Sequence, residues 1–377
     1  MELTPEDALR INVLLAGTPE AVRIDESSMT LYALSEKGEA KVKLNPNCRD
    51  EGYLRKVRET LSSQVLGSPG GYPVYLKRWT RMGQARDGIL ESLLLLGEPE
   101  AVVAVVNASG ITNELARRAW WTLQSAENAR CMLHQPAVVS GDMGPKLAEF
   151  LIEFLPFEEE ARDQIVSVRL VLQGDLISPR EKTRLWEKGR QKNAYHVGFL
   201  QALPDALPQE RPAHPLWESL QPALAGLLAA GNPFALQLSR LLGAAGQAWL
   251  ATVATVLEKP SNQDVVVELL HAIAAYSVHL PIAGTCLTEM DTIAALADAL
   301  LDGGDAAGAE AGGQLAELLL AVPQARSRVR AMLILAMVNE PLVNPVFSRT
   351  DAIGTVMRKK LRPVSGPIRE QIDILTG

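Results

Sequence analysis

Two cysteines stand where a thiol could take part in chemistry. Cys48 lies in a loop directly before a predicted helix, and the partial positive charge of a helix N-terminus favours a thiolate. Cys131 lies on a predicted helix beside Arg130, although adjacent residues of a helix point in different directions. We keep both as candidate reactive thiols, able to accept a persulfide if their pKa is lowered. The alternative is that both are structural cysteines.

Cys131 and His134 share one face of that predicted helix, as two ligands of a metal ion would. A zinc site needs four such ligands, or three and a water molecule. No other pair of cysteine and histidine residues in the chain has a matching spacing. We therefore expect no metal ion and no cofactor, with both residues in structural roles.

Other catalytic patterns are missing from the sequence. There is no Ser-His-Asp ordering, no pair of carboxylates in an evident cleft and no Rossmann glycine motif. No small-molecule substrate is indicated, and we expect a protein that is not an enzyme. An enzyme whose site residues are scattered along the chain is the alternative that a single sequence leaves open.

Basic residues are concentrated in two segments. The first is a predicted loop with Lys77, Arg78 and Arg81 near its tip. The second is 180–192, in which six cations surround Trp186. These six cations are Arg180, Lys182, Arg184, Lys188, Arg190 and Lys192. Such segments bind acidic proteins or RNA, and both are candidate partners here. The alternative is an exposed helix with its tryptophan in the core and its cations in solvent, where they pair with neighbouring glutamates.

The composition is that of a globular protein rich in helices. The chain has 377 residues, of which 47% are hydrophobic and 21% charged, and its formal net charge is −7. These values exclude a wholly disordered chain, a collagen and a disulfide scaffold. Leu and Ala dominate while aromatic residues make up only 5%, which favours helices over strands.

The compartment that the sequence favours is the cytoplasm. The first residues are acidic and polar, unlike a secretory signal or a transit peptide. No window holds about 18 uninterrupted apolar residues, so we expect no membrane span. Three widely spaced cysteines are typical of a reducing compartment.

Residues 1–82 are predicted to form a small α+β domain. A helix should begin after Thr4, which is a good N-cap residue. Three short runs follow with the spacing of β-strands, at 21–25, 29–34 and 40–44. We expect them to pair as an antiparallel meander, and a second helix should run from Asp50 to about Leu66.

From residue 83 onward the pattern is helical almost throughout. Residues 87–122 follow the order helix, Gly-x-Pro, helix, polar turn and Arg-bearing helix, with Thr112 or Asn113 as the cap of the last helix. This order resembles HEAT-like repeats, in which helical hairpins stack on their neighbours to bury their apolar faces. We therefore expect an α-solenoid over 83–203. An irregular helical domain is the alternative.

Residues 204–377 are predicted to form a C-terminal helical domain. It begins with a connector at 204–215 that contains four prolines, a residue that fixes φ and lacks a backbone donor. Further helices are expected at about 216–230, 233–257, 262–278, 289–302 and 326–338. A basic tail around 358–362 should follow them.

Four stretches of the sequence are similar to a known family. They are 44–50 (LNPNCRD), 65–81 (VLGSPGGYPVYLKRWTR), 118–121 (RAWW) and 127–133 (ENARCML). Together with the chain length they resemble the DsrS family of sulfur reduction proteins, which is encoded in the reverse dissimilatory sulfite reductase gene cluster of sulfur-oxidising bacteria. The resemblance implies a cytoplasmic accessory role in the oxidation of stored sulfur, with partners among the proteins of that machinery. It implies no reaction, and it assigns no catalytic residue.

Overall fold

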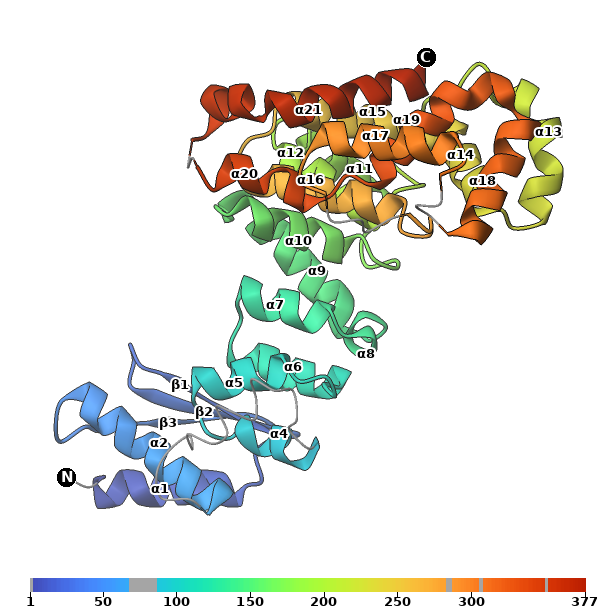
Figure 1. Ribbon diagram of the computed structural model, residues 1–377. Helices are drawn as coiled ribbons and strands as arrows, with labels where there is room; N and C mark the ends of the chain where they lie inside the picture. Colours follow the sequence, from blue (N-terminus) through green and yellow to red (C-terminus); the bar gives the residue numbers. More distant parts are fainter. Residues whose placement is uncertain (1–2, 68–86, 283–286, 305–307, 350–351) are drawn as a thin grey trace. The chain divides into compact units, whose positions relative to one another are not determined.

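The computed structural model describes residues 3–67, 87–282, 287–304, 308–349 and 352–377. Helices account for most of these residues, and three strands form a small sheet near the N-terminus (Figure 1). The structure thus confirms a mainly helical protein with a small N-terminal α+β part. A stacked repeat along the remaining helices stays a prediction.

The chain divides into two compact units, Met1–Pro156 and Phe157–Gly377. The first unit holds the sheet together with the helices up to residue 156, and the described residues of the second unit form helices and no strand. Independent folding of the three ranges 1–82, 83–203 and 204–377 stays a prediction.

The sheet is the antiparallel meander that the sequence predicts. Its order is β1 (Ala21–Asp25), β2 (Thr30–Ser35) and β3 (Gly38–Lys43). The carboxylate of Asp25 accepts hydrogen bonds from the backbone and hydroxyl groups of Ser27 and Ser28, which fixes the turn between β1 and β2. These hydrogen bonds, chiefly from the two serine hydroxyls, lower the pKa of Asp25 to about 2.

Helices α1 (Pro5–Ala16) and α2 (Asp50–Leu66) lie on one side of this sheet (Figure 1). Thr4 caps α1 as predicted, because its hydroxyl accepts a hydrogen bond from the Asp7 amide. The core between helices and sheet includes Ile11, Val22, Leu31, Tyr53, Val57 and Leu61. Within it, the Tyr53 hydroxyl donates to the buried Asp7 carboxylate over 2.5 Å. This hydrogen bond joins α1 to α2 across the core.

Among the described residues of the first unit, six further helices follow α2. The amide of Val22 donates to the carbonyl of Leu94 over 2.8 Å, so the chain that follows the first of these helices lies against the free edge of β1. Thr112 caps the third of them, as one of the two predicted cap positions, by accepting a hydrogen bond from the Leu115 amide. The six are α4 (Asp87–Leu93), α5 (Pro99–Val106), α6 (Asn113–Thr122), α7 (Ala126–Leu133), α8 (Pro136–Val139) and α9 (Met143–Phe154).

The second unit is built around α12 (Asn193–Ala202). Every residue from Ala194 to Leu200 is buried, so this helix has protein on all sides. Gly198 allows the closest approach, since a Cβ atom there would lie 2.7 Å from the side chain of Val168. The helices packed against α12 are α10 (Ala161–Val171), α11 (Pro179–Lys188), α15 (Ala244–Glu258) and α16 (Gln263–Tyr276).

The remaining described helices of this unit are α13 (Trp217–Ala229), α14 (Pro233–Leu242), α17 (Met290–Leu301), α18 (Ala309–Ala321), α19 (Arg326–Ala336), α20 (Asn344–Phe347) and α21 (Gly354–Thr376). Among them, α14 and α21 pack on α15, and α19 packs on α16. The connector at 204–215 has no regular secondary structure, in agreement with its prolines. It is nevertheless fixed to the unit, because the His214 amide donates to the Leu242 carbonyl over 2.8 Å.

The prediction of one helix over 233–257 is wrong. Helices α14 and α15 meet at Gly243, whose extended backbone ends one helix and begins the next, and the two axes differ by 73°. The turn is tight, because a Cβ atom at Gly246 would lie 2.0 Å from the carbonyl oxygen of Arg240. A side chain there would collide with the backbone, so the glycine permits the bend.

The expected basic tail is part of a helix of 23 residues, α21. Prolines normally interrupt helices, and α21 contains both Pro363 and Pro367. The helix persists because one face of it is buried along its whole length. The buried apolar residues on that face are Met357, Leu361, Val364, Ile368, Ile372 and Leu375. Packing against α15 and α19 therefore outweighs the cost of the prolines.

Candidate functional site

Helix α11 carries most of the second basic segment, and its beginning follows directly from the sequence. The Ser178 hydroxyl accepts a hydrogen bond from the Glu181 amide, and the Glu181 carboxylate accepts one from the Ser178 amide. This reciprocal pair is a capping box, and Pro179 occupies the first helical position. The hydrogen bonds from Ser178 lower the pKa of Glu181.

Two residues of α11 fix the helix to the rest of the unit. Leu185 and Trp186 are buried, and the indole ring lies 4.4 Å from the His196 ring and 5.1 Å from the Phe199 ring, measured between centroids. The His196 Nε2 atom lies 3.1 Å from the Trp186 carbonyl oxygen, to which it donates. Both ring partners are on α12, so α11 lies directly on the central helix.

Most cations of the segment are exposed. Arg180, Arg184, Arg190 and Lys192 are exposed, while the other two, Lys182 and Lys188, are half-buried. Among the residues that the structure describes, none of the six forms a hydrogen bond or ion pair through its side chain. The expected pairing with Glu181 is limited to attraction by Arg184, and that with Glu187 is not formed among the described residues. An open surface hollow of about 890 Å³ lies beside Arg180, Glu181 and Arg184.

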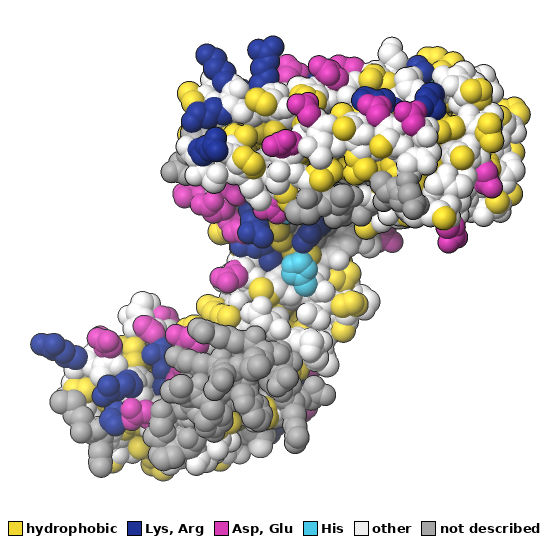
Figure 2. All heavy atoms as spheres, in the orientation of Figure 1, with side chains coloured by type: hydrophobic (Ala, Val, Ile, Leu, Met, Phe, Trp, Pro, Cys, Tyr) yellow, Lys and Arg dark blue, Asp and Glu magenta, His cyan; other side chains and the backbone are white. Residues whose placement is uncertain are grey.

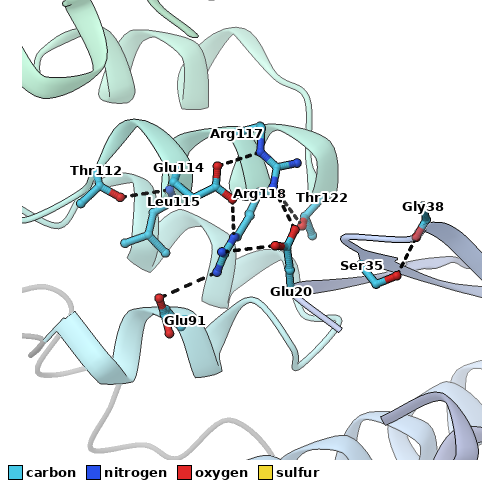
Figure 3. Close-up of polar contacts among 10 residues, drawn as sticks. All are labelled: Glu20, Ser35, Gly38, Glu91, Thr112, Glu114, Leu115, Arg117, Arg118 and Thr122. Carbon is cyan, nitrogen blue, oxygen red and sulfur yellow. Dashed lines mark hydrogen bonds and ion pairs between the residues drawn. The ribbon is translucent and has the colours of Figure 1, made fainter. Parts of the chain in front are cut away.

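The arginines of helix α6 form ion pairs, unlike the cations of α11 (Figure 3). Arg117 lies 2.9 Å from Glu20 and 2.5 Å from Glu114, and Arg118 lies 2.8 Å from Glu114 and 3.8 Å from Glu91. The pairs with Glu91 and Glu20 join α6 to α4 and to the residue before β1, and those with Glu114 lie within α6. The arginines of α6 are thus neutralised inside their unit, whereas the cations of α11 are not.

A second group of cations lies at the beginning of α21. Lys359, Lys360 and Arg362 are exposed and have no ion pair among the described residues, and Arg358 is half-buried. Figure 2 shows Lys and Arg side chains gathered over this end of the second unit. We call Lys359, Lys360 and Arg362 the α21 cluster.

The other predicted site residues do not join these cations. Lys77, Arg78 and Arg81 lie outside the described residues. Cys48 is half-buried against the core of the first unit. Cys131 is also half-buried, and burial is the main cause that raises the pKa of its thiol. Within the described part of the chain, no group of three or more His, Cys, Asp or Glu residues could hold a metal ion.

One site was not predicted from the sequence. Residues of α10, α12, α14 and α16 line a pocket of about 350 Å³ in the second unit. Its charged members, Arg169, Arg240 and Glu268, are about 70 and 30 residues apart along the chain, so no local motif joins them. The only available signal is on α16, where Glu268, Ala272 and Ala275 recur at helical spacing on one face.

Comparison with known proteins gives no match of this chain to a family model, to a curated protein or to a solved structure. In the described part of the chain, no single helix is long and apolar enough to cross a membrane; α14 and α15 together would qualify by length and composition, across their 73° bend.

Proposed function

We propose that this chain is a non-enzymatic cytoplasmic accessory protein of dissimilatory sulfur oxidation, and that it binds an acidic protein partner through the outer face of α11. The observation that carries the binding part is the set of six cations on and after α11 without an ion pair among the described residues. The pathway rests on the resemblance to the DsrS family. In this proposal the helices after the sheet form a HEAT-like array that presents α11 to the partner.

The geometry of Trp186 favours a protein partner over RNA. Proteins that bind single-stranded RNA combine cations with exposed aromatic rings, on which the bases stack. Trp186 is buried between α11 and α12, so its ring is not accessible to a base. Carboxylates of an acidic protein need only the guanidinium groups, which bind them in a bidentate manner.

The experiment is a pull-down with the tagged full-length chain from the cytoplasm of a sulfur-oxidising bacterium. The test variant is Arg180→Glu with Arg184→Glu and Arg190→Glu, which reverses three exposed charges on and after α11. The matched control reverses the α21 cluster through Lys359→Glu, Lys360→Glu and Arg362→Glu. Both variants change the net charge equally, so a nonspecific electrostatic effect would appear in both.

We expect the unmodified chain and the α21 control to recover the same acidic protein of the sulfur-oxidation machinery in stoichiometric amounts. The α11 variant should lose it at least about tenfold, because several charged contacts are removed at once. Equal recovery by all three chains would show that α11 is not the binding face. Loss of recovery after ribonuclease treatment would show that the chain binds RNA rather than a protein.

A further inference from the structure

The pocket in the second unit has an apolar lining between two polar ends. Leu200, Pro204, Ala272 and Ala275 supply apolar surface. The two alanines leave space beside α16 that larger side chains would fill. At about 350 Å³ the pocket is at the small end of the range for organic ligands. A small molecule with an apolar body therefore fits its size and lining.

One end of the pocket is rigid. The ring of Tyr276 is stacked on that of Trp249, with 4.0 Å between the centroids and 14° between the planes. The Arg240 guanidinium lies 3.7 Å from the centre of the Tyr276 ring, and it also binds Asp205 through two contacts of 2.8 and 2.7 Å. This end thus presents a fixed aromatic ring beside an arginine whose charge is already neutralised.

The polar groups at the other end also have partners within the protein. The Glu268 carboxylate accepts a hydrogen bond of 2.9 Å from the side-chain amide of Gln201. It also lies 3.8 Å from the Arg162 guanidinium. The His271 Nε2 atom lies 3.0 Å from a carboxylate oxygen of Glu340. Glu268 and His271 therefore do not require a charged ligand.

Arg169 is the exception among the charged groups that line the pocket. Its side chain comes from α10 and is half-buried, yet it forms no hydrogen bond or ion pair with any described residue. A guanidinium is always charged and carries five donors arranged to bind carboxylates in a bidentate manner. Among the described residues, the guanidinium of Arg169 is thus a positive charge at the pocket wall that no carboxylate pairs with.

We propose that this pocket binds a small organic carboxylate, whose anionic group pairs with Arg169 and whose apolar body lies against Ala272, Ala275 and Tyr276. No described residue supplies a carboxylate to Arg169, so a ligand carboxylate adds an ion pair without breaking one of those described. The site is separate from the outer face of α11, and the proposal does not depend on a partner at that face.

The test compares three probes of nearly equal shape: benzoate, benzamide and benzylamine. They carry a negative, a neutral and a positive group on the same ring. Binding to the full-length chain is measured by titration calorimetry and by the shift of the thermal unfolding midpoint, because a ligand that binds only the folded state stabilises it. We expect saturable binding of benzoate at millimolar concentration and none of benzylamine, with benzamide at least about tenfold weaker than benzoate.

Two variants assign the binding to Arg169. Arg169→Met keeps much of the side-chain volume and removes the charge, and it should weaken benzoate binding at least about tenfold. Arg362→Met removes an exposed charge from α21, outside the pocket and the α11 face, and should leave benzoate binding unchanged. Far-ultraviolet circular dichroism confirms that each variant is folded. Absence of benzoate binding, equal binding of all three probes, or unchanged binding to the folded Arg169→Met variant would overturn the proposal.

The result is independent of the partner experiment. Loss of benzoate binding in Arg169→Met with normal recovery of an acidic protein supports the pocket and the α11 face separately. Failure of the α11 pull-down would leave the benzoate titration unaffected, since the two sets of residues do not overlap.

Discussion

At the scale of single residues, burial decides what the candidate thiols can do. Sequence spacing placed Cys131 on a helix beside a cation, and the structure confirms that it lies on α7. Its degree of burial could not be predicted, because that depends on which neighbouring helices cover it. Burial, with a smaller contribution from Glu127, raises the pKa of the thiol, whereas Arg130 acts weakly in the opposite direction.

We therefore expect Cys131 to react slowly with a thiol reagent at neutral pH, because only the thiolate is nucleophilic. The measurement is the rate of iodoacetamide labelling against pH, in a chain that keeps Cys131 while Cys48 and Cys286 are changed to Ser. The rate should rise only above the usual thiol pKa of about 8.5, and the denatured chain should react faster at neutral pH. Fast labelling of the folded chain, with a midpoint below that value, would instead support a persulfide acceptor.

At the scale of elements, the sequence predicted those that depend on local signals. The strands of the meander and the Thr4 and Thr112 caps follow from residue type and period within a few positions. Two elements were not predicted, the bend at Gly243 and the full length of α21, because both depend on packing between distant segments. The pocket at Arg169 was missed for the same reason, since four separate helices form it.

The attachment of α11 to α12 gives a prediction at this scale. Trp186→Ala should lower the free energy of unfolding by about 3–5 kcal/mol, because it leaves a cavity between the rings of His196 and Phe199. Gly189→Ala should also destabilise, since a Cβ atom would lie 2.2 Å from the His196 ring. Urea denaturation measures both.

The control for these two variants is Arg184→Ala, an exposed residue of the same helix. It should change the free energy of unfolding by no more than about 0.5 kcal/mol. An equally small effect of Trp186→Ala would show that α11 is not anchored by its tryptophan.

At the scale of the whole molecule, ion pairs within a helix and between helices make stability depend on pH. Hydrogen bonds from Arg117 and Arg118 lower the pKa of Glu114 in the first unit, and a hydrogen bond from Arg330 lowers that of Asp298 in the second. The folded chain therefore holds these carboxylates ionised at a pH where the unfolded chain begins to protonate them. Each unit contains such an ion pair, so acid should lower the stability of both units.

The sign of this effect gives the last prediction. A carboxylate whose pKa is lowered by folding contributes its full stabilisation above its unfolded pKa, about 4.3 for Glu and 3.9 for Asp. That contribution is lost as the pH falls through the lower folded pKa. Stability from these pairs should thus be constant between about pH 7 and pH 5 and should decline progressively below about pH 4.5.

Urea denaturation at a series of pH values tests this with Glu114→Gln and Glu100→Gln. Glu100 is exposed and has no ion pair among the described residues, so it controls for the loss of one carboxylate. Glu114→Gln should be less stable than the unmodified chain at neutral pH, and the difference should shrink as the pH falls below about 4.5, because protonation removes the same ion pairs in the unmodified chain. Glu100→Gln should follow the unmodified chain at every pH. A difference for Glu114→Gln that persists undiminished in acid would mean that the amide disturbs packing, and that the charge of Glu114 contributes no pH dependence.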